Sequence, residues 1–264
     1  MKSKDAMAFI DSHCHLDFPM FDHDREQIMA CCRDLSIDKL IMPGVYREDW
    51  SRLLDFCRKY DQLFVALGLH PCYLDLADES YLPELDDLLQ KNPQVVAIGE
   101  IGLDFFEKGY DETRQRLFFQ QQVQLAGYHK RPLILHVRKA HDQVASILKQ
   151  LKFDQGGVVH CYSGSLQQAK KYLDLGFRLG IGGVITYPRS ARLQKIVASL
   201  PLSSFLLETD APDIPTSGHQ RERNSPVYLI EIFNALADKR SEQPGELEAQ
   251  LYHNTMATFE RLKK

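Results

Sequence analysis

His13 and His15 are separated by a single residue at the end of the apolar run Ala8–Leu16. Because successive side chains of a strand point to opposite faces, both imidazoles would face the same way, about 6.5–7 Å apart along the strand, and Cys14 would face the other side. Two imidazoles placed like this can hold Zn²⁺, Mn²⁺ or a similar ion. On its own the pair is more typical of hydrogen-bonded histidines at a strand end, so its interpretation depends on the rest of the chain.

Four further side chains of the metal-ligand type end other apolar runs, namely Glu100, His136, His160 and Asp210. Each of them alone could be a satisfied polar group of the core. An unpaired polar group buried there would cost several kcal/mol, however, and six such groups at equivalent strand ends are hard to explain without a cation. The six residues together predict a metal site.

The number of ligands indicates two metal ions. A catalytic zinc typically uses three protein ligands and a water molecule, so six ligands exceed the needs of one ion. Two divalent cations about 3.5–4 Å apart that share a carboxylate would use all six. Zn²⁺, Mg²⁺ and Mn²⁺ all stay open as their identity. The charge of two such ions exceeds that of two carboxylates and leaves a positive field suited to a phosphate or a developing oxyanion.

Hydrolysis is the chemistry that such a pair of cations supports. A water that bridges both ions would lose its proton near neutral pH, and the resulting hydroxide would attack phosphorus or a carbonyl carbon. We expect Asp210 to be the catalytic residue that accepts this proton and returns it to the leaving group. The alternative is that Asp210 acts only as a metal ligand.

Three residues are candidates for binding the substrate. Arg138 lies two residues beyond His136 and so shares its direction; its guanidinium could bind a phosphate through two hydrogen bonds or pair with a carboxylate at the rim. His70 could donate to a phosphate or form a hydrogen bond within the rim. Asn224 is the weakest of the three, because it could equally be the N-cap of the last helical region.

Two carboxylates are expected to act through other residues. Asp11 and Glu208 precede His13 and Asp210 by two positions, which places them one layer deeper on the same face of their strands. We expect both of them to orient ligating histidines.

Short apolar runs of strand length alternate along the chain with longer amphipathic segments. Eight such units predict an α/β fold, a closed (β/α)8 TIM-type barrel whose strand ends converge on one site. An open doubly wound sheet is the alternative, but no G-x-G-x-x-G motif follows an early strand. The predicted strands are Ala8–Leu16, Lys39–Val45, Leu63–His70, Val95–Leu103, Pro132–Val137, Gly157–Cys161, Phe177–Gly183 and Ser204–Thr209.

Helical patterns lie between the strands, and Thr113–Lys130 is the longest of them. We expect one broad apolar side on this helix, made of Leu117, Phe118, Gln121, Val123, Leu125 and Tyr128. The other examples are Asp22–Leu35, Glu48–Tyr60 and Arg189–Leu200.

The chain has 264 residues, with 32 Lys and Arg against 36 Asp and Glu, for a net charge of −4. We expect a single domain over residues 1–264, because no linker or shift of composition divides the sequence. The acidic balance argues against a protein that binds nucleic acid through an overall positive charge, so any positive field must be local. The six cysteines form no C-x-x-C pair and are expected to be reduced thiols.

No apolar stretch approaches the roughly 18 residues of a membrane helix, and the N-terminal sequence has no apolar signal-peptide core. We therefore expect a cytoplasmic protein that does not enter a membrane. No obligate protein partner is evident.

The sequence resembles the TatD family of metal-dependent hydrolases, within the amidohydrolase-like superfamily. The resemblance implies a TIM-type barrel that binds two divalent cations and cleaves phosphodiester bonds, with deoxyribonuclease activity as the usual family assignment. It also implies that His13, His15, Glu100 and Asp210 hold one ion, and that Glu100 as the bridge, His136 and His160 hold the other. The matching segments are Asp11–Leu16, Gly68–Pro71, Ile98–Asp104, His136–Arg138, His160–Gly164, Glu208–Pro212, Arg223–Pro226 and Asn254–Phe259.

Two departures from the family pattern concern the mouth of the barrel. Tyr162 stands where the family usually has Phe, which keeps an aromatic ring. The loop at residues 213–218 lacks the usual aromatic and aliphatic pair, and this puts the substrate preference in question rather than the metal ligands.

The function we predict is a divalent-metal-dependent hydrolase of phosphodiester bonds, a deoxyribonuclease of the 3'-5' exonuclease kind, with nucleic acid, and DNA in particular, as its substrate. Hydrolysis of a C–O or C–N bond in a lactone, cyclic amide or aminoacyl ester is the alternative. A non-catalytic metal-holding protein is less favoured, because mixed carboxylate and imidazole ligands without thiolates suit an open reactive site. Binding of nucleic acid without cleavage is disfavoured by the net charge.

Overall fold

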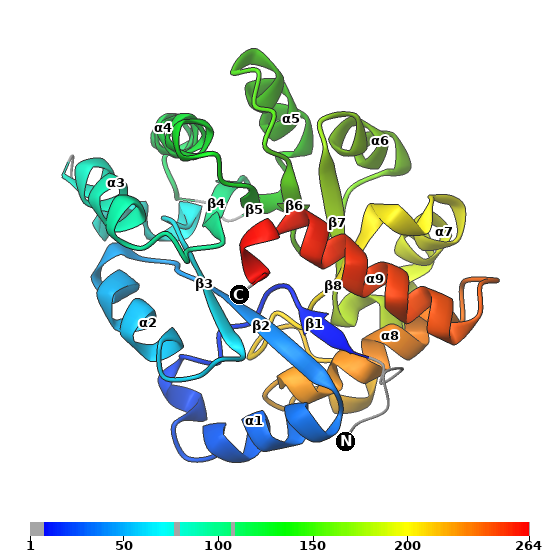
Figure 1. Ribbon diagram of the computed structural model, residues 1–264. Coiled ribbons are helices and arrows are strands. Elements are labelled where there is room, and N and C mark those ends of the chain that lie inside the picture. Colours follow the sequence, from blue (N-terminus) through cyan, green and yellow to red (C-terminus); the bar gives the residue numbers. More distant parts are fainter. Residues whose placement is uncertain (1–7, 77–79, 107–108, 264) are drawn as a thin grey trace.

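Eight parallel strands surround a common axis in the computed structural model, which describes residues 8–76, 80–106 and 109–263 (Figure 1). Each strand pairs with the next one in the chain, and the backbone N–H of Ser12 donates to the carbonyl of Leu207 at 3.0 Å across the remaining seam. The predicted (β/α)8 barrel is confirmed. The strands are β1 (Phe9–Asp11), β2 (Ile37–Pro43), β3 (Leu63–Leu67), β4 (Ala97–Asp104), β5 (Leu133–Arg138), β6 (Gly157–Val159), β7 (Phe177–Ile181) and β8 (Phe205–Leu207).

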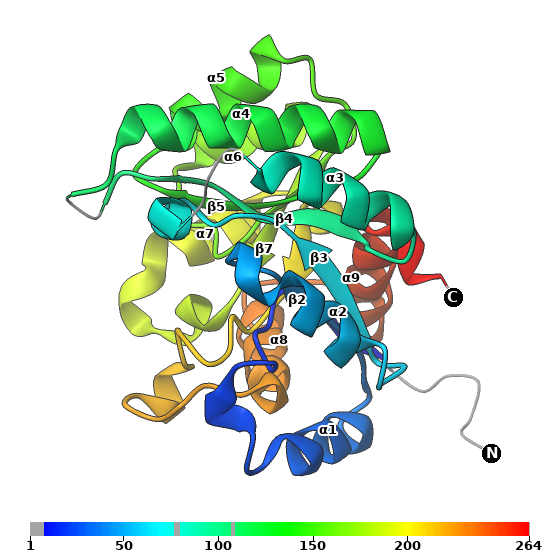
Figure 2. The ribbon, with the colours of Figure 1, turned by 90° about the vertical axis from the view of Figure 1, so that its left-hand side faces the viewer.

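Helices cover the outside of the strands, as the two perpendicular views show (Figures 1 and 2). Each of the first eight helices follows the strand of the same number, and a ninth crosses one end of the barrel. They are α1 (Arg25–Asp34), α2 (Trp50–Cys57), α3 (Tyr81–Lys91), α4 (Glu112–His129), α5 (His141–Gln150), α6 (Leu166–Asp174), α7 (Ala191–Ser199), α8 (Leu229–Ala237) and α9 (Pro244–Thr258). In the part of the chain that the structure describes, no helix combines the length and apolar character needed to cross a membrane.

The buried face of α4 differs from the prediction. Leu117 and Tyr128 are 51% and 76% exposed, so they do not belong to an apolar side. The buried positions include Gln115 and Gln122, whose amides bond to the backbone of the strand ends and loops below them. The apolar pattern missed this face because two of its members are polar residues that satisfy buried backbone groups.

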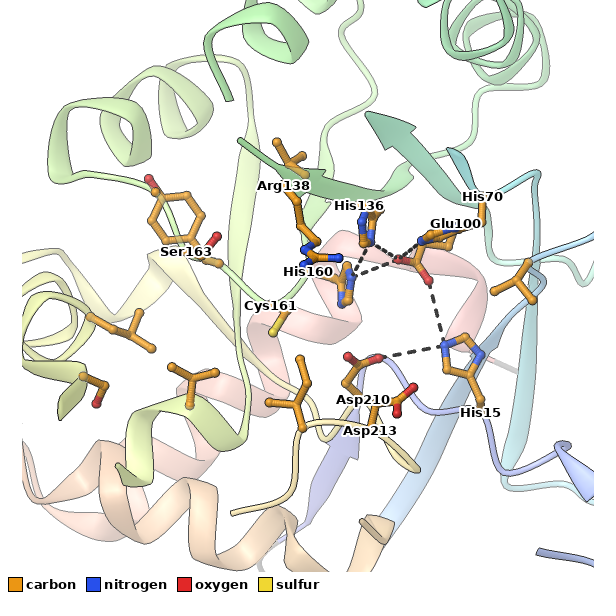
Figure 3. Close-up of a pocket in the computed structure, with 18 of the residues that line it drawn as sticks. His15, His70, Glu100, His136, Arg138, His160, Cys161, Ser163, Asp210 and Asp213 are labelled. Carbon is orange, nitrogen blue, oxygen red and sulfur yellow. Dashed lines mark hydrogen bonds and ion pairs between the residues drawn. The ribbon is translucent and has the colours of Figure 1, made fainter. Parts of the chain in front are cut away.

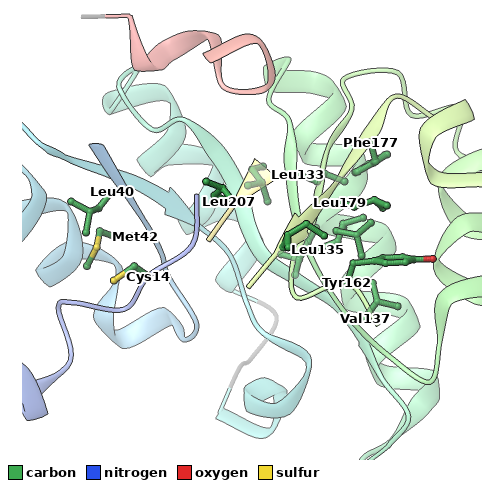
Figure 4. Packing of buried hydrophobic residues seen from close by; sticks show 14 of the residues in the cluster. Cys14, Leu40, Met42, Leu133, Leu135, Val137, Tyr162, Phe177, Leu179 and Leu207 are labelled. Atoms are coloured by element: carbon green, nitrogen blue, oxygen red, sulfur yellow. The ribbon is translucent and has the colours of Figure 1, made fainter. Parts of the chain in front are cut away.

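The outward faces of the strands pack beneath the helices. On β5, Leu133, Leu135 and Val137 belong to this outer cluster, and Cys14 lies in it as well (Figure 4). Cys14 thus lies on the side away from His13 and His15, as predicted, although all three residues follow the end of β1.

The inward faces change character along the barrel axis. At the amino-terminal end of the strands, Ile134 of β5 joins Ile10, Phe64 and other apolar side chains, and Phe259 and Leu262, which follow α9, complete this cluster. Towards the carboxyl-terminal end, the polar side chains that the sequence singled out replace the apolar ones. One end of the barrel is therefore closed by an apolar core and the other carries the candidate site.

Strand β1 is shorter than predicted. It ends at Asp11, so His13 and His15 lie in the loop beyond it rather than on the strand. Strand spacing consequently does not apply to the two histidines, and the loop brings their Nε2 atoms to 3.2 Å from each other.

Candidate metal centre

Glu100 of β4 lies at the centre of the site, and its two carboxylate oxygens face different sets of nitrogen atoms (Figure 3). Oε1 lies 2.9 Å from both His136 Nδ1 and His160 Nε2. Oε2 lies 3.2 Å from His13 Nε2 and 3.8 Å from His15 Nε2. Glu100 is only 3% exposed, so this contact lies in the interior of the protein. We call the two groups of side chains that it joins the donor sets: His13 and His15 with Asp210 on the Oε2 side, and His136 and His160 on the Oε1 side.

Asp210 completes the set on the Oε2 side. It follows β8 with a φ of 60°, a conformation uncommon for residues other than glycine, and its N–H donates to the carbonyl of His13 at 2.9 Å. Its Oδ1 lies 3.5 Å from His13 Nε2 and 3.9 Å from His15 Nε2. The loops after the first and last strands therefore hold each other in place.

The spacing of these donors fits divalent cations. Two nitrogens bound to one tetrahedral Zn²⁺ at about 2.0–2.1 Å lie about 3.3 Å apart. His13 Nε2 and His15 Nε2 are 3.2 Å apart, and His136 Nδ1 and His160 Nε2 are 3.4 Å apart. Nitrogen pairs at this distance beside a shared carboxylate are the arrangement that a cation between them requires, and imidazole with carboxylate is a donor set that Zn²⁺ and Mn²⁺ accept.

The charges of the protein itself bias the protonation of this cluster. Burial alone would raise the pKa of Glu100, but the histidines around it hold that pKa well below its usual value. Burial disfavours charged His160, yet the carboxylates of Glu100 and Asp210 outweigh it and raise the pKa of His160 to about 10. Burial raises the pKa of Asp210 to about 7. A cation that binds here must therefore displace a proton from His160.

Asp104 is a functional candidate that the sequence analysis left without a role. Its Oδ2 lies 3.0 Å from His136 Nε2, on the opposite side of the ring from Glu100. An N–H at Nε2 that donates to Asp104 leaves the lone pair of Nδ1 directed at the site, which is how a carboxylate orients a ligating histidine. The spacing in the sequence places Glu100, Gly102 and Asp104 on one face of β4, but only the pairing of Gly102 with His136 in the structure brings Asp104 beside that ring.

Asp11 and Glu208, which are predicted to orient histidines, both accept hydrogen bonds from backbone N–H groups of the site. Asp11 accepts hydrogen bonds from the backbone N–H groups of His13 and Thr209, at 3.2 and 3.0 Å, and so ties β1 to the end of β8. Glu208 accepts from the N–H of Cys161, and its Oε1 is 3.8 Å from His160 Nδ1. Glycine at position 180 leaves room for this carboxylate, since a Cβ there would lie 2.2 Å from it.

His70 reaches further into the site than a rim residue would. Its Nδ1 accepts a hydrogen bond from the N–H of Cys72 at 3.1 Å, so the ring proton is on Nε2, which lies 3.5 Å from Glu100 Oε1. Burial lowers the pKa of His70 to about 4 and keeps the ring neutral. His70 therefore presents an N–H donor to the site.

Arg138 pairs with a carboxylate at the rim, which is one of the two alternatives that the sequence left open. Its Nη1 lies 3.2 Å from Asp104 Oδ2, and its guanidinium lies 4.3 Å from the centre of the Phe106 ring. The side chain is still 42% exposed and lines the pocket above the donor sets. It thus pairs with a carboxylate at the rim and also faces incoming molecules.

Asn224 neither lines the pocket nor contacts the cluster around Glu100, unlike the other predicted site residues. It is fully buried, and its Nδ2 donates to the carbonyls of Thr209 and Asp213 at 2.8 and 2.7 Å. It is not the cap of the next helical turn either, since Ser225 occupies that position. Asn224 fixes the loop that carries Asp210, so we do not assign it to substrate binding.

A pocket of about 1190 Å³ opens above the donor sets, at the carboxyl-terminal ends of the strands. Asp213 and Ile214 line it, which places the divergent loop at the mouth as expected. Tyr162 lines it too, and its hydroxyl donates to the carbonyl of Ser165 at 2.6 Å. The substitution of Tyr for Phe therefore adds a hydrogen bond and keeps the ring in place.

Known proteins share both the sequence and the fold. The family described as TatD related DNase matches residues 10–260. The metal-dependent hydrolase YjjV of Escherichia coli (strain K12) is 41% identical over 252 residues, which cover 95% of this chain and 97% of that protein. The crystal structure of YjjV superimposes with a TM-score of 0.92 and covers 96% of this chain and 98% of that chain. The 3'-5' ssDNA/RNA exonuclease TatD of Cronobacter sakazakii (strain ATCC BAA-894) is 32% identical over 246 residues, 90% of this chain and 93% of that protein.

Proposed function

Because this chain belongs to the TatD-related DNase family and is therefore a metal-dependent hydrolase, we propose that it cleaves phosphodiester bonds of single-stranded nucleic acid from a 3' end. The observation that carries the proposal is the buried Glu100 carboxylate, whose two oxygens each face two imidazole nitrogens. A relative named as a 3'-5' exonuclease on single-stranded DNA and RNA supports this choice of substrate. We favour DNA.

Two divalent cations would account for the donors. His13, His15, Asp210 and Glu100 would hold one ion, and Glu100, His136 and His160 would hold the other. Such cations lower the pKa of bound water and polarise the phosphoryl oxygen. Zn²⁺, Mn²⁺ and Mg²⁺ are the ions to test.

The side chains of the protein perform the remaining steps. Asp210 lies at the edge of the donor sets and lines the pocket, so its carboxylate can take a proton from the attacking water and return it to the leaving oxygen. His70 Nε2–H and the guanidinium of Arg138 are donors that line the same pocket, and both can bind the phosphate oxygens that do not react.

The experiment is hydrolysis of end-labelled single-stranded DNA by protein reconstituted with each of the three metals. We expect shortening from the 3' end, abolished by chelator and by His136→Ala. His23→Ala is the matched control, because His23 is a solvent-exposed histidine outside the pocket. Metal-loaded protein that leaves both DNA and RNA intact but opens a cyclic amide, a lactone or an aminoacyl ester would replace the nuclease with the alternative predicted from the sequence.

A further inference from the structure

The pocket extends well beyond the residues that would hold the cations. One side of it is formed by the loop after β6, residues 161–164, and by the segment after β7 that leads into α7. We name this side the distal arm and define it by residues 161–164 with Val184, Tyr187, Arg189, Ser190, Arg192 and Leu193. None of these residues is needed to hold a metal ion, so metal binding does not explain why they line the pocket.

Charge is distributed unevenly along the pocket. The carboxylates that line it, Glu100, Asp210 and Asp213, all belong to the half with the donor sets. The distal arm contributes Arg189 and Arg192 and no carboxylate. In a chain with a net charge of −4, two arginines without an acidic neighbour in the lining are a local anion-binding feature.

The two arginines are held over the arm by different contacts. The guanidinium of Arg189 lies 5.1 Å from the centre of the Tyr187 ring. Arg192 Nη2 donates to the carbonyl of Ser163 at 2.6 Å, which joins the two loops of the arm. This bond uses one of five N–H donors of the guanidinium, so the side chain is positioned and still able to bind a phosphate.

Apolar and aromatic surface accompanies the positive charge. Val184 is 37% exposed although it is an aliphatic residue, and Tyr187, whose hydroxyl donates to the carbonyl of Pro215 at 3.0 Å, is fixed beside it. Proteins that bind single strands combine cations for the backbone with flat or apolar surfaces for the bases. The distal arm offers both within the same cavity as the donor sets.

We propose that the distal arm binds the stretch of a single nucleic-acid strand next to the bond that is cut, with its phosphate on Arg189 and Arg192 and its base against Tyr187 and Val184. This inference rests on the proposed nuclease function and names the residues that select a strand over a small diester. A substrate too short to reach the arm loses these contacts and keeps those at the cations.

The test compares an oligonucleotide with bis(p-nitrophenyl) phosphate, a small diester, for Arg189→Ala and Arg192→Ala. A hydrogen bond to a charged group contributes enough for KM of the oligonucleotide to rise about tenfold in each variant, with a much smaller effect on the small diester. Lys195→Ala is the matched control, because Lys195 is an exposed cation of the same helix α7 that does not line the pocket. Arg189→Lys should restore part of the binding, since it restores the charge.

Salt dependence gives a second readout that a purely structural role would not move. Each lost phosphate contact should reduce the slope of log K against log salt by about 0.7 for a single strand, measured by equilibrium binding in an Asp210→Asn background. If the slopes and the oligonucleotide KM are both unchanged, the proposed role of the distal arm is wrong, although the proposed nuclease function still stands. Equal losses on both substrates with a lowered melting temperature would also overturn it, whereas wild-type protein that cuts neither substrate would overturn the nuclease itself.

Discussion

The two ends of this barrel are built from the same strands and behave in opposite ways. On the inward face of β5, Ile134 lies in the apolar end, His136 in the donor sets and Arg138 at the mouth, each two residues after the last. The apolar end buries side chains whose removal from water stabilises the fold. The end with the donor sets buries charged and polar groups, which disfavours folding unless they are paired. The apolar end therefore stabilises the fold, and this offsets the free-energy cost of burying charged and polar groups at the end with the donor sets.

The largest effect is expected at the donor sets. Glu100→Gln removes the charge that both sets share, so we expect metal content to fall and kcat/KM to drop at least about 1000-fold, the size of the several kcal/mol that metal ions contribute to the transition state. Metal content by elemental analysis and single-turnover hydrolysis check it. A variant with two bound ions and more than a tenth of the activity would contradict the bridging role.

A substitution at the apolar end should lower stability and leave metal binding unchanged. Phe259 is fully buried against the inward faces of the strands, and Phe259→Ala should lower the free energy of unfolding by about 3–5 kcal/mol through lost burial and a cavity. Urea unfolding in the presence of chelator measures it. Folded Phe259→Ala protein should bind metal as the wild type does, and Phe259→Leu serves if the alanine variant does not fold. Loss of metal at unchanged stability would show that the ends are not independent.

Substitution of Asp104 tests how far metal binding by the donor sets depends on a residue that would not itself contact a cation. Asp104→Asn removes the carboxylate that orients His136, and we expect metal affinity and activity to fall about 10–100-fold. Asp86 makes a matched control, because its Oδ1 pairs with His129 Nε2 at 2.6 Å between α3 and α4, outside the pocket. If Asp104→Asn and Asp86→Asn behave alike, Asp104 has no special role.

Metal binding should depend on pH with a definite sign. Since the pKa of His160 is raised to about 10 in the protein without cations, this imidazole keeps its proton up to that pH and metal must displace it. Affinity should therefore increase with pH between 6 and 8, by up to about tenfold per unit for each proton released. Calorimetry in two buffers with different ionisation enthalpies counts the protons. Release of none at pH 7 would contradict the assigned charge state.

The smallest effect concerns a partly exposed ion pair that does not line the pocket. Arg223 Nη1 lies 3.0 Å from Asp24 Oδ1, and this hydrogen bond lowers the pKa of Asp24. Because the pKa is lower in the folded state, the pair stabilises the protein above the pKa of the unfolded chain and this contribution is lost as pH falls. Asp24→Asn should cost at most about 1 kcal/mol at pH 7 and less at pH 3, measured by urea unfolding at both values. A larger cost at pH 3 would contradict it.

The fold and the donor residues were largely predictable from the sequence, and the reasons are physical. Buried parallel strands consist of apolar side chains on both faces, so ligand-type residues such as Glu100 and His136 stand out within them. The loops were harder to predict. The end of β1 at Asp11 and the approach of His13 to His15 depend on contacts with β8, nearly two hundred residues away in sequence.

Roles that depend on hydrogen-bond partners could not be predicted from residue type. Asn224 and Asp104 are both polar residues next to motifs, yet one holds a loop and the other contacts His136. The distal arm was hidden for a related reason, because Arg189 and Arg192 fell within a predicted helix and only the packing of two loops shows that they share a cavity.

The bond between Asp210 and the carbonyl of His13 has a consequence for synthesis of the protein. His13 and His15 leave the ribosome early, and Asp210 emerges some two hundred residues afterwards. A nascent chain consequently cannot bring Asp210 to His13 and His15 until β8 docks beside β1. A chain that ends before β8 lacks Asp210, and we expect it to be inactive as a hydrolase.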